Sequence, residues 1–287
     1  MPHLLQDPSA LAAWKREALG RVSWRLSRRE LLGAAAAGAA ALAGFSLGAR
    51  RSSAAEAPGP MHGPVPAAPP PADADGPKTV VTGTFYFPRL LFHVRDETGD
   101  QWNIYPVADV ILRRRLRQLT NVNVSQDPVV VRLADLDNTC RYPFVFATSE
   151  GYFDLPDIEK KNLKEFLLRG GFVLADDCVL GKTGDRFFRD YTRIVNQLFQ
   201  SEGLAMTRVP NDHEIFHCYF DFPDGAPFIQ GVNHGAHGLF EKDTGRIMTF
   251  LTPGDIHCGW TCMWAPRDLC EACLRMGINI IVYYLTH

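Results

Sequence analysis

The sequence predicts an α/β domain with a doubly wound, mostly parallel sheet, and three features from residue 79 onward carry that prediction. Short runs of β-branched and aromatic residues alternate with longer segments in which apolar residues recur at helical spacing. The run at 172–175 is apolar throughout, which is typical of a central strand covered on both faces. Strands separated by helices require crossover connections, and these make neighbouring strands parallel. We therefore expect a single domain over residues 79–287.

The first predicted elements occupy the start of this domain. Residues 79–87 (TVVTGTFYF) are rich in β-branched and aromatic side chains and predict a strand. Residues 104–119 predict a helix, because their apolar side chains recur at helical spacing after a capping side chain at Asn103. Two short apolar runs, 129–133 and 143–147, then predict two more strands.

The clearest helical signal lies at residues 155–169. Asp154 can accept hydrogen bonds from the first turn, and Gly170 stands where a left-handed residue ends a helix. The apolar strand 172–175 follows directly. A helix that leads into a buried strand in this way is typical of one crossover unit of a parallel sheet.

Two helices and a strand complete the predicted domain. Residues 185–199 and 269–285 carry apolar stripes at helical spacing, and residues 246–251 between them predict a late strand. Ligands of doubly wound sheets bind beyond the carboxyl ends of the strands. That rule directs attention to the loops at 148–151 and 176–178.

Residues 1–55 predict a twin-arginine export signal. The segment at 27–32 has the sequence Ser-Arg-Arg-Glu-Leu-Leu, and an Ala-rich apolar run extends from it to residue 48. Small residues at 53–57 offer a cleavage site. We therefore expect a periplasmic protein, or one anchored in the membrane if the signal is not cleaved. An ordinary amphipathic or buried helix at the start of the domain is the alternative.

Residues 56–78 contain eight prolines and almost no large apolar side chains, so they predict a disordered linker. The first 55 residues hold eight basic and three acidic residues, whereas the whole chain carries a net charge of −2. The remainder of the chain therefore carries −7. A mildly acidic domain without a basic tract is a poor partner for a phosphate backbone, so we do not expect nucleic-acid binding.

Five segments of the domain match a known family in their order and spacing. They are 142–146 with Gly151, 167–177, Asp212–His213 with Ile215–Phe216, Gly254–Asp255 with 258–260, and 279–286. Together they resemble the family named domain of unknown function 4159, and the resemblance covers nearly all of residues 79–287. The resemblance implies a flavodoxin-like sheet similar to that of the class I glutamine amidotransferases, and it implies no settled activity.

The same resemblance allows the sequence to be checked for an amidotransferase site. Those enzymes place a nucleophilic cysteine on a strained turn between strand and helix, where flanking glycines expose backbone N–H groups to an oxyanion. Counted from Gly170–Gly171, Asp177 takes the position of the nucleophile and Cys178 comes one residue later. The flanking glycines are missing as well. We therefore expect a domain without amidotransferase activity.

Carboxylates and histidines near the predicted crevice are the candidate binding residues. A pair of aspartates at the end of a strand can bind a cation, act as a base or accept hydrogen bonds from sugar hydroxyls. The structural alternative is that these aspartates cap the next helix and satisfy buried N–H groups. We expect the ligand site to comprise Glu150, Asp176, Asp177, His213 and His217.

Four of the seven cysteines form a group near the end of the chain, with the spacing C-x3-C-x7-C-x2-C. Four thiolates at such intervals can bind zinc or an iron–sulfur cluster. Two disulfides formed in the periplasm are the alternative. The members of this group are Cys258, Cys262, Cys270 and Cys273, and the other three cysteines, expected to be buried thiols, are Cys140, Cys178 and Cys218.

These observations favour an exported domain that binds a small-molecule ligand or a protein partner, for example as an accessory subunit of an envelope complex. The alternative function is that of a hydrolase acting on a carbohydrate or a related small molecule. In that case Asp177 and His213 are the expected catalytic acid–base groups.

Overall fold

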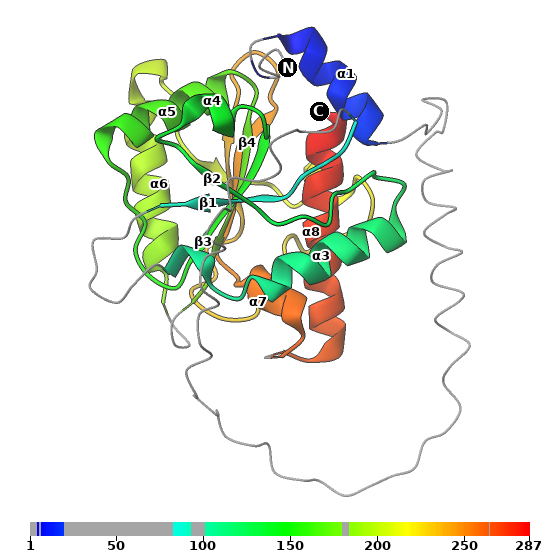
Figure 1. The fold of residues 1–287 in the computed structure, drawn as a ribbon. Helices are drawn as coiled ribbons and strands as arrows, with labels where there is room; N and C mark the ends of the chain where they lie inside the picture. The colour runs from blue at the N-terminus through cyan, green and yellow to red at the C-terminus, as the bar shows by residue number, and fades with distance from the viewer. Residues whose placement is uncertain (1–4, 6, 20–82, 93–100, 180–183, 264) are drawn as a thin grey trace, which may run out of the picture.

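The structure is a computed structural model of the chain, and it describes residues 5, 7–19, 83–92, 101–179, 184–263 and 265–287. Most of the predicted export signal and all of the predicted linker lie outside the described residues. The described part of the chain is a mixed α/β fold, in which helices cover both faces of one central sheet (Figure 1).

The sheet has seven strands in the order β2-β1-β3-β4-β7-β6-β5. The first five strands in this order are parallel, and the remaining two strands extend the sheet in antiparallel fashion. The predicted mostly parallel sheet is therefore confirmed, and the order of its parallel part is compatible with a flavodoxin-like sheet. The strands are β1 (Pro88–Leu91), β2 (Val129–Arg132), β3 (Phe144–Ser149), β4 (Phe172–Asp177), β5 (Thr207–Arg208), β6 (His237–Phe240) and β7 (Ile247–Thr252).

The helices form one layer on each side of the sheet (Figure 1). One layer contains α1 (Pro8–Ala18), α3 (Val107–Leu119), α7 (Ile256–Thr261) and α8 (Arg267–Thr286). The other layer contains α4 (Leu136–Thr139), α5 (Asp157–Leu168) and α6 (Arg186–Leu198). Short 3-10 turns lie at η3 (Gln101–Asn103), η4 (Gln200–Glu202) and η5 (Glu214–Phe216).

An aromatic cluster between the sheet and α8 forms the centre of the core. The ring of Phe144 lies 5.3 Å from Phe85, 5.4 Å from Phe172 and 5.5 Å from Tyr284, measured between ring centroids. Offset and edge-on aromatic pairs of this kind add stability beyond the area they bury. Of the strand predicted at 79–87, residues 79–82 lie outside the described residues; within 83–87, Phe85 makes one isolated parallel bridge to Val124, and β1 begins only at Pro88.

Helix α8 belongs to this core. Among the described residues it is the one helix long and apolar enough to cross a membrane, but 72% of the relevant window is buried inside the fold. Its first turn is partly exposed, whereas residues 276–285 are buried throughout. Length and composition alone therefore do not distinguish α8 from the core helix of a doubly wound domain.

Helix α1 lies within the predicted signal, yet it packs on the domain beside the C-terminal end of α8 (Figure 1). Asp7 caps its first turn by accepting a hydrogen bond from the backbone N–H of Ser9 at 2.8 Å. Its side chains Leu11, Trp14 and Ala18 belong to the same core cluster as the sheet. The sequence patterns did not predict this helix.

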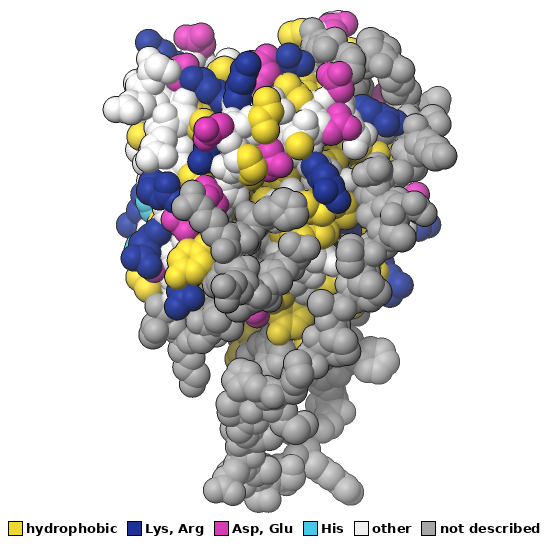
Figure 2. All heavy atoms as spheres, turned by 60° about the vertical axis from the view of Figure 1, so that its left-hand side comes forward, with side chains coloured by type: hydrophobic (Ala, Val, Ile, Leu, Met, Phe, Trp, Pro, Cys, Tyr) yellow, Lys and Arg dark blue, Asp and Glu magenta, His cyan; other side chains and the backbone are white. Residues whose placement is uncertain are grey.

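The described surface carries charges of both signs. On the face shown in Figure 2, lysines and arginines are interspersed with aspartates and glutamates. This face therefore presents a mixed charge pattern. Elsewhere on the described surface, charges pair along a helix, such as Arg169 with Glu165 and Arg193 with Asp190.

Candidate functional site

A buried group of two thiols and one imidazole lies at the carboxyl edge of the sheet. Cys178 directly follows β4, and Cys258 lies in α7, with the two Sγ atoms 3.4 Å apart. His257 precedes Cys258, and one potential ligand atom from each of the three residues lies within 4.8 Å of the others. All three residues are less than 5% exposed. A Cys–His–Cys group of this size could bind a metal ion.

The chain reaches this group through a strained turn at Asp255. Residue Asp255 links β7 to α7 and has φ 58° and ψ 41°, in the left-handed region that non-glycine residues rarely adopt. Gly254 is required just before it, since a Cβ atom there would lie 2.8 Å from the carbonyl oxygen of Pro227. Strained backbone of this kind tends to cluster at functional sites, where the surrounding fold maintains it.

The side chain of Asp255 is also buried and incompletely paired. Its Oδ2 accepts a hydrogen bond from Nε2 of Gln230 at 2.6 Å, while Oδ1 is buried and has no partner among the described residues. Burial, together with the nearby charge of Asp176, raises the pKa of Asp255 to about 7. The carboxyl group of Asp255 therefore changes protonation near neutral pH. A buried group of this kind is a candidate for contact with a ligand.

Asp176 holds the first turn of α7 in place. Its Oδ1 accepts hydrogen bonds from Thr252 Oγ1 at 2.5 Å and from the backbone N–H of Ile256 at 3.2 Å. Its Oδ2 accepts from the backbone N–H of His257 at 3.0 Å. Burial raises the pKa of Asp176 to about 6, although these three hydrogen bonds oppose the shift. Asp176 thus satisfies buried backbone N–H groups, as the structural alternative expected of one of the aspartates.

A buried ion pair orients His257 from the opposite side. Arg89 on β1 donates from Nε and Nη2 to the two carboxylate oxygens of Asp109, at 2.9 and 2.7 Å. The same Nη2 lies 2.9 Å from Nε2 of His257, and Asp109 Oδ1 lies 3.5 Å from that nitrogen. Burial alone would raise the pKa of Asp109, but Arg89 and His257 hold it below its ordinary value.

Because Nε2 of His257 accepts from Arg89, which has donors only, the proton of the neutral ring lies on Nδ1. Nδ1 of His257 is buried and has no hydrogen-bond partner among the described residues. Burial lowers the pKa of His257, so the ring is neutral at neutral pH. A neutral imidazole is the form that ligates metals.

The two thiols are poor nucleophiles in this environment. The hydrogen bond between the thiols lowers the pKa of Cys258, but burial outweighs it and raises that pKa to about 11. The same hydrogen bond, followed by burial, raises the pKa of Cys178 well above its ordinary value. Both groups are therefore protonated at neutral pH in the absence of a positive charge.

Asp177, the residue at the expected nucleophile position, caps a helix. It is the last residue of β4, and its Oδ2 accepts a hydrogen bond from the backbone N–H of Phe188 in α6 at 3.0 Å. Burial raises the pKa of Asp177 to about 7. The non-glycine residues with positive φ in the described chain are Tyr105, Asp255 and Cys262, so the strained turn follows β7 and not β4.

His213 lies at the opposite end of the sheet from Asp177. Its ring packs against Phe240 and Tyr283, beside the first residue of β7, whereas Asp176 pairs with the last residue of that strand. A six-residue strand separates these ends by about 15 Å. The structure therefore does not bring Asp177 and His213 together, so these two residues do not form the expected acid–base pair.

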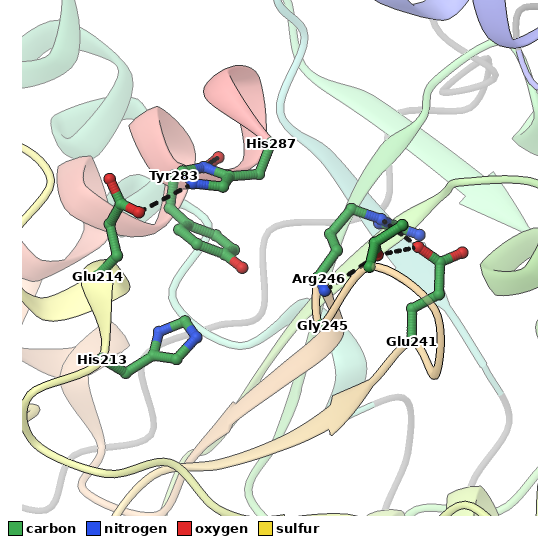
Figure 3. A pocket seen from close by; sticks show the side chains of 8 residues that line it. His213, Glu214, Glu241, Gly245, Arg246, Tyr283 and His287 are labelled. Atoms are coloured by element: carbon green, nitrogen blue, oxygen red, sulfur yellow. Dashed lines mark hydrogen bonds and ion pairs between the residues drawn. The ribbon is translucent and has the colours of Figure 1, made fainter.

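The side chain of His213 instead faces a pocket of about 410 Å³, which Figure 3 shows. His213 accepts a hydrogen bond from the backbone N–H of Ile215 and begins η5. Across the pocket, Arg246 pairs with Glu241 at 3.6 Å. The opening is further lined by Glu214, Thr244, Gly245, Tyr283 and His287.

The remaining predicted ligand residues divide between two places. Glu150 follows β3 and lies near Cys178, and burial raises its pKa. His217 is placed elsewhere, with Nδ1 bonded to Asp221 and Nε2 to the carbonyl oxygen of Asn211. The hydrogen bond with Asp221 raises the pKa of His217. Glu150 and Asp176 therefore lie near the Cys–His–Cys group, and the two predicted histidines do not.

The four-cysteine site expected from spacing does not form, and this is a second correction. Cys258 turns toward Cys178, whereas Cys262 ends α7 in an exposed left-handed position. Cys270 donates to the carbonyl oxygen of Ala265 at 3.3 Å. All seven cysteines have free thiols. The spacing misled the prediction because α7 turns Cys258 toward Cys178, whereas Cys262 and Cys270 are neighbours of one another.

Sequence reasoning missed Arg89, Asp109, Asp255 and His257. Arg89 and Asp109 lie in an apolar strand and an amphipathic helix, and no local motif marks them. Asp255 was in a segment used for the family resemblance, where Gly254-Asp255 followed a predicted strand, and His257 lies between the two parts of that segment. A glycine–aspartate pair between a strand and a helix was therefore the signal that could have located the turn.

The geometry defines the class as a doubly wound α/β domain with a buried Cys–His–Cys group at the carboxyl edge of its sheet. A comparison with protein-family models matches residues 90–285 to DUF4159, a domain of unknown function. The chain belongs to this family. No curated protein matches the sequence.

Proposed function

We propose that this domain binds one zinc ion at the carboxyl edge of the sheet, with Cys178, His257 and Cys258 as ligands. The supporting observation is that the three potential ligand atoms lie within 4.8 Å of one another in a buried site. Two thiolates and one imidazole are the donor set that zinc accepts in tetrahedral sites. Water or the unpaired Oδ1 of Asp255 would complete the fourth position.

The carboxylate beside His257 supports this proposal. In the structure Nε2 of His257 accepts a hydrogen bond from Nη2 of Arg89 at 2.9 Å, so the proton of the neutral ring lies on Nδ1. A metal on Nδ1 requires this proton to move to Nε2 and Nη2 of Arg89 to turn away, and Asp109 Oδ1, 3.5 Å away, would then accept the proton. Metal-bound histidines usually donate their second ring N–H to a carboxylate in this way, which fixes the ring and strengthens the ligand.

The proposal is also compatible with the raised pKa values of the two thiols. A divalent cation displaces the thiol protons, so the same buried thiols that are inert without metal become thiolate ligands. Proton release on binding makes the affinity rise with pH. The bound ion would link β4 to α7 and stabilise the strained turn at Asp255 between them.

Metal analysis of the full-length protein tests the proposal. We expect about one zinc per chain after purification under reducing conditions, and loss of that zinc in Cys178→Ser and His257→Gln. Cys140→Ser is the matched control, because Cys140 is also a buried free thiol but lies outside the group. Absence of bound zinc in the wild-type chain, before and after incubation with zinc, would overturn the proposal.

The wider role that we propose is that of an exported domain without amidotransferase activity, which binds a ligand or serves as an accessory subunit of an envelope complex. The twin-arginine pattern at 27–32 supports export, and folded export would allow the metal to be acquired in the cytoplasm. The use of Asp177 as a helix cap and the raised pKa of Cys178 argue against a thiol nucleophile at the end of β4. Cell fractionation of the wild type and of Arg28→Lys/Arg29→Lys tests the location, since export predicts that the double variant accumulates in the cytoplasm.

A further inference from the structure

Helix α1 precedes the apolar run of the predicted signal and the rest of the domain follows that run, yet the two pack together in the fold. Helix α1 ends at Ala18, before the arginine pair at 28–29 and the apolar run that ends at residue 48. The described domain resumes at residue 83. The packing of α1 therefore joins two segments that an inserted signal would hold apart.

The contacts of α1 are those of an integral part of the core. Trp14 is 3% exposed and its ring lies 6.5 Å from that of Phe85, while Ala18 is fully buried. The carbonyl oxygen of Ala18 accepts a hydrogen bond from the backbone N–H of Asn123 at 2.8 Å. Leu11 reaches Gly170, the residue that ends α5. The helix thus contacts three separate segments of the domain.

The apolar contacts of α1 are large on the scale of protein stability. Leu11 and Trp14 are both almost fully withdrawn from water, and burial of apolar side chains of this size is the main favourable contribution to folding. Separating α1 from the domain therefore removes a substantial part of the stability of the folded chain.

One contact works in the opposite direction. The amine of Lys15 is buried over the ring of Tyr284, with Nζ 4.2 Å from the ring centroid. Burial, with a smaller effect of Arg246, lowers the pKa of Lys15 to about 7, although Glu241 opposes the shift. A buried amine therefore offsets part of the apolar contribution of α1.

Membrane topology makes docking and insertion mutually exclusive. A chain that crosses a bilayer once has its flanking segments on opposite sides of the membrane, and basic residues before the crossing stay on the cytoplasmic side. If residues 31–48 make that crossing, α1 and the domain cannot touch. The docked arrangement is therefore compatible with the chain before insertion, when both segments share one compartment.

We infer that α1 is an N-terminal cover of the folded precursor. It is docked on α8 and Phe85 before export and is displaced when residues 31–48 enter the membrane. Displacement of α1 exposes the apolar surface around Phe85, Gly170 and Tyr284 on the exported domain. The inference rests on the proposed export, and it is independent of the proposed metal site.

The docking is tested on the full chain with a protease site inserted between residues 56 and 78. After cleavage, native mass spectrometry should show the N-terminal fragment still bound to the domain in the wild type. Leu11→Ala/Trp14→Ala should release it, whereas Arg16→Ala should not, because Arg16 is on the exposed side of α1. Release of the wild-type fragment as readily as that of the double variant would overturn the inference.

A second measurement separates this inference from the proposed export. Hydrogen exchange on the uncleaved full chain should show protected amides in α1, and unprotected amides there would overturn the docking. Native mass spectra of the protein isolated from the two cell fractions then compare the states. We expect α1 bound in the cytoplasmic Arg28→Lys/Arg29→Lys variant and absent from the exported domain. An exported domain that retains bound α1 contradicts the cover, whereas a wild-type protein that never leaves the cytoplasm contradicts the export.

Discussion

Replacing Arg89 with methionine should strongly destabilise the domain, because it leaves a buried carboxylate without its partner. The side chains of Arg89 and Asp109 are 3% and 10% exposed, and the guanidinium contacts both carboxylate oxygens. Removing one member of a buried ion pair typically costs about 3–5 kcal/mol. We therefore expect Arg89→Met to lower the free energy of unfolding by about that amount, which is a large fraction of the stability of an ordinary domain.

The assay is urea unfolding of the full-length protein at pH 7, compared across matched variants. Arg89→Met/Asp109→Leu should recover most of the loss, since apolar replacement of both partners of a buried pair is often close to neutral. Arg115→Met is the surface control. Its partner Glu271 lies 2.5 Å away, but the two side chains are 30% and 28% exposed, so we expect a loss below about 1 kcal/mol.

The pH dependence gives the same prediction a second test. In Arg89→Met, burial without the arginine raises the pKa of Asp109 in the folded state above its unfolded value. The folded state then binds more protons, so the stability of the variant should recover as pH falls from 7 to 5. Two results together would refute the reasoning. Arg89→Met/Asp109→Leu would be as unstable as Arg89→Met at pH 7, and the stability of Arg89→Met would not recover as pH falls.

Three further predictions concern individual side chains. The folded-state pKa of Lys15 is about 7, below the ordinary value of 10.5, so the unfolded chain binds more protons between these values and stability should rise with pH there by at most about 1.4 kcal/mol per unit. In urea unfolding, Lys15→Met should flatten this rise and stabilise the chain at pH 7; a wild-type profile that is already flat would contradict the assignment. Asp177→Asn keeps an acceptor for the N–H of Phe188 and should preserve the melting temperature at pH 7. Asp177→Ala should lose about 1 kcal/mol of stability and melt at a lower temperature. Equal melting temperatures of the two variants would argue against the cap. Asp255→Gly should raise the free energy of unfolding by about 1 kcal/mol, because glycine relieves the left-handed backbone. Asp255→Asn keeps an acceptor for Gln230 and should not raise it. Calorimetry that shows no difference between the two variants would argue against backbone strain at this position.

The sequence located the parallel strands other than β1, because their signals are local and repeated. The run at 172–175 and the capped helix before it correctly located β4 and α5. The short antiparallel strands β5 and β6 were not predicted, because two to four residues carry too little periodicity. Helix α1 was missed for a different reason, since its apolar face is explained by contacts with residues more than 60 positions away.

The candidate site also depends on contacts between residues that are distant in the sequence. Carboxylates after β4 were expected to bind a ligand, but Asp176 and Asp177 are held by backbone N–H groups of two different helices. Cys178 was treated as a buried thiol, and its neighbour Cys258 was assigned to a group of nearby cysteines in the sequence. The two meet because β4 and β7 are adjacent in the sheet, which no local spacing reveals.

Cobalt titration of the reduced full-length protein tests the proposed metal centre most directly. The account predicts saturation at about one equivalent, with the intense near-ultraviolet absorption of cobalt–thiolate bonds, and zinc should abolish it by displacement. The absorption should be lost in Cys258→Ser and retained in Cys140→Ser. Titration without thiolate absorption in the wild-type chain would contradict a metal site formed by Cys178, His257 and Cys258.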